Sequence, residues 1–157
     1  MKTLVIYDSV FGNTEKVAQA IGKVLGATNA TVKKVTEVAE SDLKALDWII
    51  AGSPTRAFRP TEGMNTFLKT LDAGSLKDVK AAVFDTRISP ETIKSKAFRF
   101  IVSRAGYAAP AMAKLLQSKG AEVIGGPEGF LVLESEGPLA EGELERAAAW
   151  VKSITKK

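Results

Sequence analysis

The sequence predicts an α/β fold, in which a parallel sheet of five strands lies between two layers of helices. Short apolar runs alternate along the chain with segments whose apolar residues recur at helical spacing, and this alternation is typical of that class. The run Leu4–Tyr7 is apolar without interruption, as expected for a strand buried on both faces of a parallel sheet. The length of 157 residues suits one core, so we expect a single domain over residues 1–157.

Five segments are expected as strands because they are short, apolar and bounded by turn residues. They are residues 4–7, 30–35, 47–52, 79–84 and a fifth strand made of residues 122–124 and 130–133. The second of them contains Lys33 and Lys34 as well as valines, a composition that favours the edge of the sheet. The glycine- and proline-containing residues 125–129 interrupt the fifth strand.

Helical spacing of apolar residues predicts helices between these strands. The first helix starts near Asn13, which suits an N-cap, and a short helix over residues 41–46 is expected to be capped by Ser41. A further helix follows Thr61. Its apolar stripe consists of Met64, Phe67, Leu68 and Leu71.

Two helices are expected between residues 89 and 120. Pro90 suits the first turn of one of them, and Gly106 and Pro110 break the pattern before the other begins. Pro138 is expected to open the last helix. Its inward-facing residues are expected to be Leu144, Ala147, Ala148 and Val151.

The composition excludes several kinds of chemistry. The chain contains no Cys, which rules out disulfides, thiolate catalysis and thiolate metal sites. It also contains no His, the commonest metal ligand and the commonest general base at neutral pH. We therefore expect no metal site and no catalytic side chain, and we expect the chemistry to come from a bound cofactor.

Charge and hydropathy bear on partners and location. The net charge of +4 and the pI of about 9.3 favour an acidic partner. No basic run is interleaved with aromatic residues, so nucleic-acid binding is not expected. No stretch has the apolar length of a membrane span or the pattern of a signal peptide, so we expect a cytoplasmic location and no membrane partner.

The segment between the first strand and the first helix suits a phosphate group. Ser9, Asn13 and Thr14 can hydrogen-bond through their side chains, and Gly12 leaves the backbone accessible. The first amides of a helix have no partner within the helix, and the helix dipole favours an anion there. Hydrogen bonds to a charged group contribute about 1.5–3 kcal/mol each, so several could hold a phosphate without Lys or Arg. The alternative is an ordinary strand-to-helix turn.

This segment resembles the phosphate loop of the flavodoxin family. The matching residues stand in the register of the family pattern; they are Tyr7, Ser9, Gly12, Thr14 and Ala18. The resemblance implies that the loop surrounds the phosphate of FMN. It also implies a flavodoxin-like three-layer sandwich with strand order 2-1-3-4-5. Ligands of such sheets bind beyond the carboxyl ends of the strands, where the strand order reverses.

The resemblance further implies that three loops hold FMN. They are residues 9–14, residues 53–61 and residues 85–89. The second loop is similar to that of flavodoxins and of FMN-dependent quinone reductases, whereas the third departs from the family pattern of glycines and an aromatic residue. The candidate cofactor-binding residues are Ser9, Val10, Phe11, Gly12, Asn13, Thr14, Ser53, Pro54, Thr55, Arg56, Ala57, Phe58, Asp85, Thr86 and Arg87.

Some of these candidates have an expected role at the flavin ring. Phe58 is the aromatic residue of the second loop, and we expect it to cover one face of the ring. Thr55 and Thr86 are expected to hydrogen-bond ring heteroatoms, and Tyr107 is a further candidate from the following segment. The alternative is that Phe58 packs within its own loop and that each threonine hydrogen-bonds to groups of its own loop.

Three cations are expected to converge on the site, namely Arg56, Arg59 and Arg87. A cation about 8 Å from the ring would stabilise the reduced, anionic flavin by roughly 2 kcal/mol at an effective dielectric constant of 20. The sequence therefore predicts that the midpoint potential of the flavin is less negative than in acidic flavodoxins. We expect Arg87→Ala to lower this potential. In the alternative, Asp85 pairs with Arg87 and little of this effect remains.

Three functions from different classes agree with these features. The leading interpretation is an FMN-binding redox protein, monomer or homodimer, that transfers electrons between protein partners. The second is an FMN-dependent oxidoreductase that reduces quinones with NAD(P)H. The third is a flavodoxin-like interaction module without flavin. A Walker-type phosphate loop is not supported, because the chain lacks the required Gly-Lys-Ser/Thr pattern.

Overall fold

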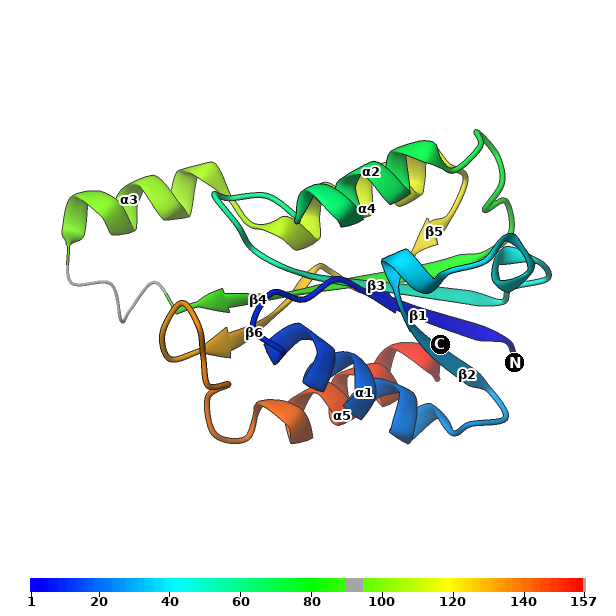
Figure 1. The fold of residues 1–157 in the computed structure, drawn as a ribbon, viewed down its shortest axis with the longest axis horizontal. Helices are drawn as coiled ribbons and strands as arrows, with labels where there is room; N and C mark the ends of the chain where they lie inside the picture. The colour runs from blue at the N-terminus through cyan, green and yellow to red at the C-terminus, as the bar shows by residue number, and fades with distance from the viewer. Residues whose placement is uncertain (90–94, 157) are drawn as a thin grey trace.

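A parallel sheet runs through the middle of the molecule, with helices on both of its faces (Figure 1). The computed structural model describes residues 1–89 and 95–156. The sheet has the order β2-β1-β3-β4-β5, and β6 also pairs with β4. Its strands are β1 (Thr3–Tyr7), β2 (Ala30–Lys34), β3 (Trp48–Pro54), β4 (Lys80–Ile88), β5 (Glu122–Val123) and β6 (Glu128–Val132). The predicted α/β sandwich and strand order are confirmed.

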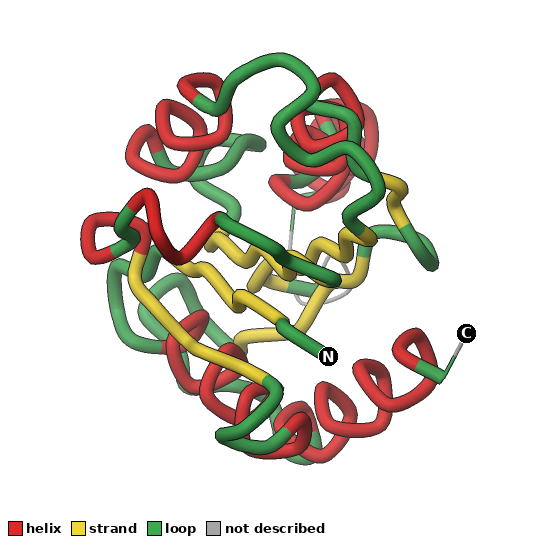
Figure 2. The backbone as a smooth tube through the Cα atoms, turned by 90° about the vertical axis from the view of Figure 1, so that its right-hand side faces the viewer, coloured by secondary structure: helices red, strands yellow, loops and turns green. Residues whose placement is uncertain are grey.

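Two helical layers enclose the sheet, as Figure 2 shows from the side. One layer contains α1 (Asn13–Leu25) and α5 (Glu143–Thr155), and the other contains α2 (Glu62–Thr70) and α4 (Ala108–Ser118). The strand residues alternate between the two cores. Leu4 and Ile6 pack with α2 and α4, whereas Val5 and Tyr7 pack with α1 and α5. None of the described helices is long and apolar enough to cross a membrane.

Strand β4 is longer than the sequence predicts. It continues through Asp85, Thr86 and Arg87, which were expected in a loop. The reason is the divided fifth strand. On one side Lys80 and Ala81 pair with β5 and residues from Phe84 to Ile88 pair with β6, and on the other side β3 pairs with residues from Lys80 to Thr86. Pairing with neighbouring strands therefore keeps β4 extended over its whole length.

The short helix predicted over residues 41–46 is instead a 3-10 helix, η2 (Glu40–Leu43). A preceding 3-10 turn, η1 (Val35–Glu37), connects it to β2. Ser41 does not cap η2. The Asp42 carboxylate takes that role because it accepts the amide of Ala39 at 2.7 Å.

The last helix begins later than expected. Pro138 lies in the preceding loop, where its carbonyl oxygen accepts the amide of Leu133 at 2.9 Å, and α5 begins at Glu143. The expectation that Leu144 faces inward is wrong, because that side chain is 39% exposed. Glu143 occupies the buried position instead, since its carboxylate accepts the amide of Leu131 at 2.6 Å. Three other residues were expected inward: Ala147 and Val151 are buried, and Ala148 is half-buried.

The helix expected to start at Pro90 lies partly outside the described residues. The described helix α3 (Lys96–Ala105) extends past the carboxyl ends of β4 and β6 (Figure 1). Gly106, with a φ of 88°, separates it from α4 as predicted. Pro110 lies in the first turn of α4 and does not break it, because first-turn amides need no partner within the helix.

Candidate functional site

A cleft of about 340 Å³ opens where β1, β3 and β4 end, and we call it the main cleft. This is the edge at which ligands of doubly wound sheets bind. Its lining residues come from the three predicted loop regions and from the chain after β6. They are Ser9, Val10, Phe11, Asn13, Thr14, Pro54, Thr55, Arg56, Ala57, Thr86, Arg87, Ile88, Val132 and Ser135.

The first side of the main cleft is the turn between β1 and α1. The Ser9 hydroxyl accepts the amide of Gly12 at 3.0 Å, which closes the turn. Gly12 has a φ of 91° and is the N-cap of α1, a conformation that glycine adopts without strain. Asp8 anchors the turn to the second loop, because its carboxylate accepts the Ser9 amide at 3.0 Å and the Thr61 hydroxyl at 2.6 Å.

Asn13 does not have the predicted capping role. It is the first residue of α1, and its side-chain amide donates to the carbonyl oxygen of Glu136 at 3.1 Å. This hydrogen bond joins residues 123 positions apart in the sequence. It holds the chain after β6 beside the first turn, which explains why Ser135 lines the main cleft.

The first turn of α1 keeps its amides available. Within the part of the chain that the structure describes, the amides of Asn13, Thr14 and Glu15 donate to no protein atom. Such amides carry the positive end of the helix dipole and bind anions. Asn13 and Thr14 also line the main cleft, so an anion in the cleft can reach this helix end.

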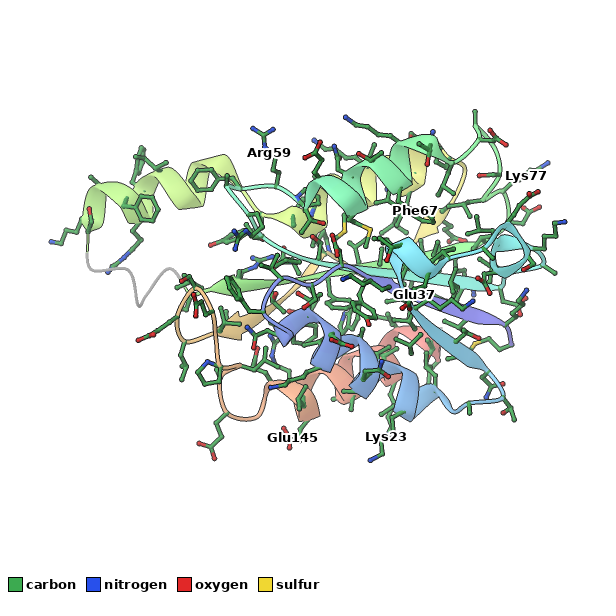
Figure 3. The ribbon with its side chains drawn as sticks, viewed as in Figure 1. Lys23, Glu37, Arg59, Phe67, Lys77 and Glu145 are labelled. Atoms are coloured by element: carbon green, nitrogen blue, oxygen red, sulfur yellow. The ribbon has the colours of Figure 1, made fainter. Side chains whose placement is uncertain are left out.

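The second side of the main cleft follows β3. Arg56 and Arg59 bond to each other through their backbones, at 2.8 Å and 3.1 Å, and enclose a tight turn. Ala57 and Phe58 in this turn have positive φ values of 47° and 70°. The Arg56 guanidinium lies 5.6 Å from the centre of the Phe11 ring and so reaches across to the first turn. Arg59 points away from the sheet (Figure 3), so the expected convergence of three arginines is wrong.

The third side of the main cleft is the end of β4. Asp85 and Arg87 form a two-pronged ion pair, at 2.6 Å and 2.7 Å, and the Asp85 carboxylate also accepts the amide of Ala109 at 2.9 Å. The Arg87 guanidinium stacks 3.6 Å from the centre of the Tyr107 ring. Asp85 therefore compensates the charge of Arg87, which is the alternative that the sequence left open. Gly129 makes room for this arrangement, because a Cβ there would lie 2.3 Å from Arg87 Nε.

The Asp85 carboxyl is fully buried, and burial raises its pKa above the ordinary value. The hydrogen bonds and charge of Arg87 and the amide of Ala109 oppose that rise. The pair thus depends on both partners. Removing Arg87 would leave the buried Asp85 carboxylate without compensation, and removing Asp85 would leave the half-buried Arg87 charge unpaired.

Four of the candidate cofactor-binding residues do not line the main cleft, and neither does the further candidate Tyr107. Gly12 shapes the turn from outside, and Ser53 is buried, where its hydroxyl accepts the amide of Thr61 at 3.0 Å. The Asp85 side chain is fully buried and pairs with Arg87. Phe58 lines a neighbouring cleft and not the main one, so the structure does not place it against a ligand ring in the main cleft.

Two lining residues, Val132 and Ser135, lie outside the loops that were expected to hold the cofactor, and Ile88 lies in the third of those loops but was not among the candidate residues. Ile88 and Val132 are register partners at the ends of β4 and β6. Both residues could have been expected as lining residues, because ligands of such sheets bind beyond the strand ends. That expectation requires that β6 be recognised as part of the sheet. Nothing in the sequence around Ser135 points to the site, because the hydrogen bond between Asn13 and Glu136 sets its position.

Comparison with solved structures finds proteins of the same fold. A flavodoxin from the domain Archaea has a TM-score of 0.74 and 21% identity, over 99% of this chain and 97% of that chain. Flavodoxin 2 from Bacillus cereus has a TM-score of 0.68 and 22% identity, over 99% of both chains. Rubredoxin oxygen:oxidoreductase from Desulfovibrio gigas has a TM-score of 0.71 and 16% identity, over 99% of this chain and 35% of that chain.

These structural likenesses show a shared fold. The family assignment comes from the sequence, since the flavodoxin domain matches residues 4–94, which is more than half of the chain. The matched region contains the turn between β1 and α1, the segment after β3 and the end of β4. The chain therefore belongs to the flavodoxin family.

Proposed function

We propose that the protein binds FMN in the main cleft and carries electrons between redox partners. Bound FMN would supply the reversible uptake of one or two electrons. The observation that carries this proposal is the group of available amides at the first turn of α1, which opens into a cleft built by three separate segments. The family assignment supports the same cofactor.

The first turn and its helix end suit a phosphate. The amides of Asn13 and Thr14 supply donors, and the Ser9 hydroxyl can donate outward while its oxygen holds the amide of Gly12. Among the described residues that line the main cleft, none carries a carboxylate that would repel an anion. Arg56 adds a positive charge at the rim. The site therefore fits an anionic group at this end.

The remaining walls suit an uncharged ring system. Pro54, Ala57, Ile88 and Val132 present apolar surface, and the charge of Arg87 is compensated by Asp85. A ligand with a phosphate at one end and an apolar ring system at the other matches such a division. In this role the chain holds the cofactor and shields it from water, and it supplies no general acid or base.

The partners are proposed to be redox proteins with acidic surfaces. The net charge of +4 favours association with a negatively charged protein. Exposed apolar residues at the rim, Val10 at 49% and Phe11 at 46%, provide contact area beside the cofactor. The electron transfer would then occur at the open edge of the main cleft.

A titration of the flavin-free protein with FMN tests the proposal, with flavin fluorescence and visible absorption as readouts. We expect submicromolar binding and quenched fluorescence, and much weaker binding of riboflavin, which lacks the phosphate. Ser9→Ala should weaken FMN binding by about tenfold, because the turn loses the bond to Gly12. Ser41→Ala, at an exposed residue of η2, is the matched control. A folded protein that binds no FMN would overturn the proposal.

A further inference from the structure

Exposed apolar side chains are concentrated on α3. Within the described part of the chain eight large apolar side chains are exposed, and three of them belong to this one helix, namely Phe98, Phe100 and Ile101. Their exposed fractions are 49%, 60% and 50%. Single exposed apolar residues are ordinary, whereas a group of them on one element marks a contact surface. Because α3 extends past the carboxyl ends of β4 and β6, this surface projects beyond the sheet (Figure 1).

The apolar residues of α3 lie on two different sides of the helix. Ala97, Phe100 and Ile101 have the spacing i, i+3 and i+4, which places them on one face, and all three are exposed. We call this face the outer stripe. Phe98 is two positions from Phe100, or roughly 200° around the helix axis. It lines the neighbouring cleft together with Phe58, so Phe98 connects α3 to the rest of the molecule.

The charged residues of α3 all have the same sign. Its sequence contains Lys96, Arg99 and Arg104 and no acidic residue, and Lys96 is exposed. The whole chain has a net charge of +4. Helices that combine exposed Phe or Leu with Lys and Arg lie in the plane of a membrane surface, where the apolar side chains enter the lipid. The cations of such a helix are attracted to anionic lipids.

Charge complementarity distinguishes a membrane from a second copy of this chain as the occupant of the outer stripe. Two copies joined through α3 would bring the cations of both helices together, and the sequence of the helix contains no acidic residue to compensate them. An anionic bilayer compensates these cations. It is also flat, so it can reach an apolar stripe on a projecting helix. We propose that α3 binds the surface of a membrane that contains anionic phospholipids.

The proposed contact is peripheral. α3 has 10 residues, which is too short to cross a bilayer, so it would lie along the surface. The expectation of no membrane partner rested on the lack of a spanning segment and does not apply to a helix of this kind. Binding through α3 requires no cofactor. Only one consequence rests on the proposed function: FMN in the main cleft would be held close to membrane-bound redox proteins.

The test is co-sedimentation of the protein with vesicles of phosphatidylcholine, alone or mixed with phosphatidylglycerol. We expect binding to the anionic vesicles only, weakened when salt rises from about 0.1 M to about 1 M, because salt screens surface charges. Ile101→Glu should weaken binding by about tenfold or more, since it places a carboxylate at the lipid boundary. Leu144→Glu is the matched control, because Leu144 is 39% exposed on α5, in the other helical layer.

The contribution of charge is tested by Lys96→Glu in the same assay. We expect this change to weaken binding to the anionic vesicles by about fivefold or more. Lys23→Glu is the control, because Lys23 is an exposed residue of α1 in the other helical layer (Figure 3). It changes the net charge by the same amount and should leave binding nearly unchanged. Circular dichroism of each variant checks that the fold is intact.

Several outcomes would overturn the proposal. A folded protein that does not bind the anionic vesicles would leave an acidic protein as the partner of α3. Equal effects of Ile101→Glu and Leu144→Glu would place the lipid contact elsewhere, and equal effects of the two lysine variants would mean that net charge alone drives binding. The assay is run on the flavin-free and on the FMN-treated protein. Vesicle binding by a protein that fails to bind FMN would support this proposal and overturn the proposed function, so the two can fail separately.

Discussion

The hydroxyl oxygens of Thr14 and Thr86 lie 2.8 Å apart, so a hydrogen bond joins the first turn of α1 to β4 at the main cleft. Both residues are buried, with exposures of 1% and 5%, and 72 positions separate them in the sequence. Each was expected to hydrogen-bond a ligand. In the structure each hydroxyl already has a partner, and this bond fixes two walls of the main cleft relative to each other.

Replacement of Thr14 by Val should destabilise the protein by about 1–3 kcal/mol, because the Thr86 hydroxyl would be buried without a partner. Thr86→Val should have a similar effect. The double variant should be more stable than the sum of the single effects predicts, since no unpaired hydroxyl remains. Urea unfolding of the four proteins gives the coupling energy, and strictly additive effects would contradict the bond.

Gly129→Ala should reduce the free energy of unfolding by about 1–3 kcal/mol, because the new Cβ would lie 2.3 Å from Arg87 Nε and force the guanidinium aside. Gly126→Ala is the control, since nothing lies within 4 Å of a Cβ at that position. Its effect should stay within about 0.5 kcal/mol. Thermal and urea unfolding measure both variants. A neutral Gly129→Ala would show that Arg87 does not lie over β6 in solution.

Asp85→Asn should raise the midpoint potential of bound FMN, because it leaves the charge of Arg87 uncompensated beside the cofactor. The expected rise is on the order of tens of millivolts. Arg87→Ala should change the potential less, because Asp85 without its partner takes up a proton and the site stays neutral.

Spectroelectrochemical titration measures these potentials. Arg59→Ala is the control, because Arg59 points away from the sheet (Figure 3). A fall in potential with Arg87→Ala that matches the rise with Asp85→Asn would mean that Arg87 acts as a free cation. That result would restore the first expectation from the sequence.

Glu143→Gln should lower stability at neutral pH by about 1–3 kcal/mol, because Glu143 accepts hydrogen bonds from Arg146 and from the amide of Leu131. Arg146 holds the pKa of Glu143 below its ordinary value of 4.5, against the effect of burial. The stabilisation is therefore complete above about pH 4.5 and is lost as the pH falls through the lowered pKa of the folded state.

The difference in stability between the wild type and Glu143→Gln should accordingly shrink below about pH 4.5, as measured by urea unfolding across the acid range. Glu145→Gln is the control, because Glu145 lies two residues further along α5 and is exposed (Figure 3). It should change stability by less than about 0.5 kcal/mol at any pH. A difference for Glu143→Gln that persists at low pH would show that the carboxylate charge is not involved.

The resemblance to the flavodoxin family implied the strand order. The sequence by itself determined the fold class and the first side of the main cleft. These features depend on neighbours in the chain: the uninterrupted apolar run Leu4–Tyr7, the helical spacing that follows it, and the hydroxyl and glycine residues between them. Hydrophobic periodicity and turn chemistry act over a few residues, so they can be recognised without knowledge of tertiary contacts.

Only the tertiary structure decided how the other sides of the clefts are built. The partners of Asn13 and Thr14 lie 123 and 72 positions away, and the neighbouring cleft that Phe58 lines also takes Phe98 from α3 and Tyr107 from the residue before α4. The ion pair of Asp85 and Arg87 depends on β6, because pairing with β6 keeps β4 extended and Gly129 leaves room for the guanidinium. Such contacts form between residues that are distant in the chain, and the local sequence around each of them does not specify its partner.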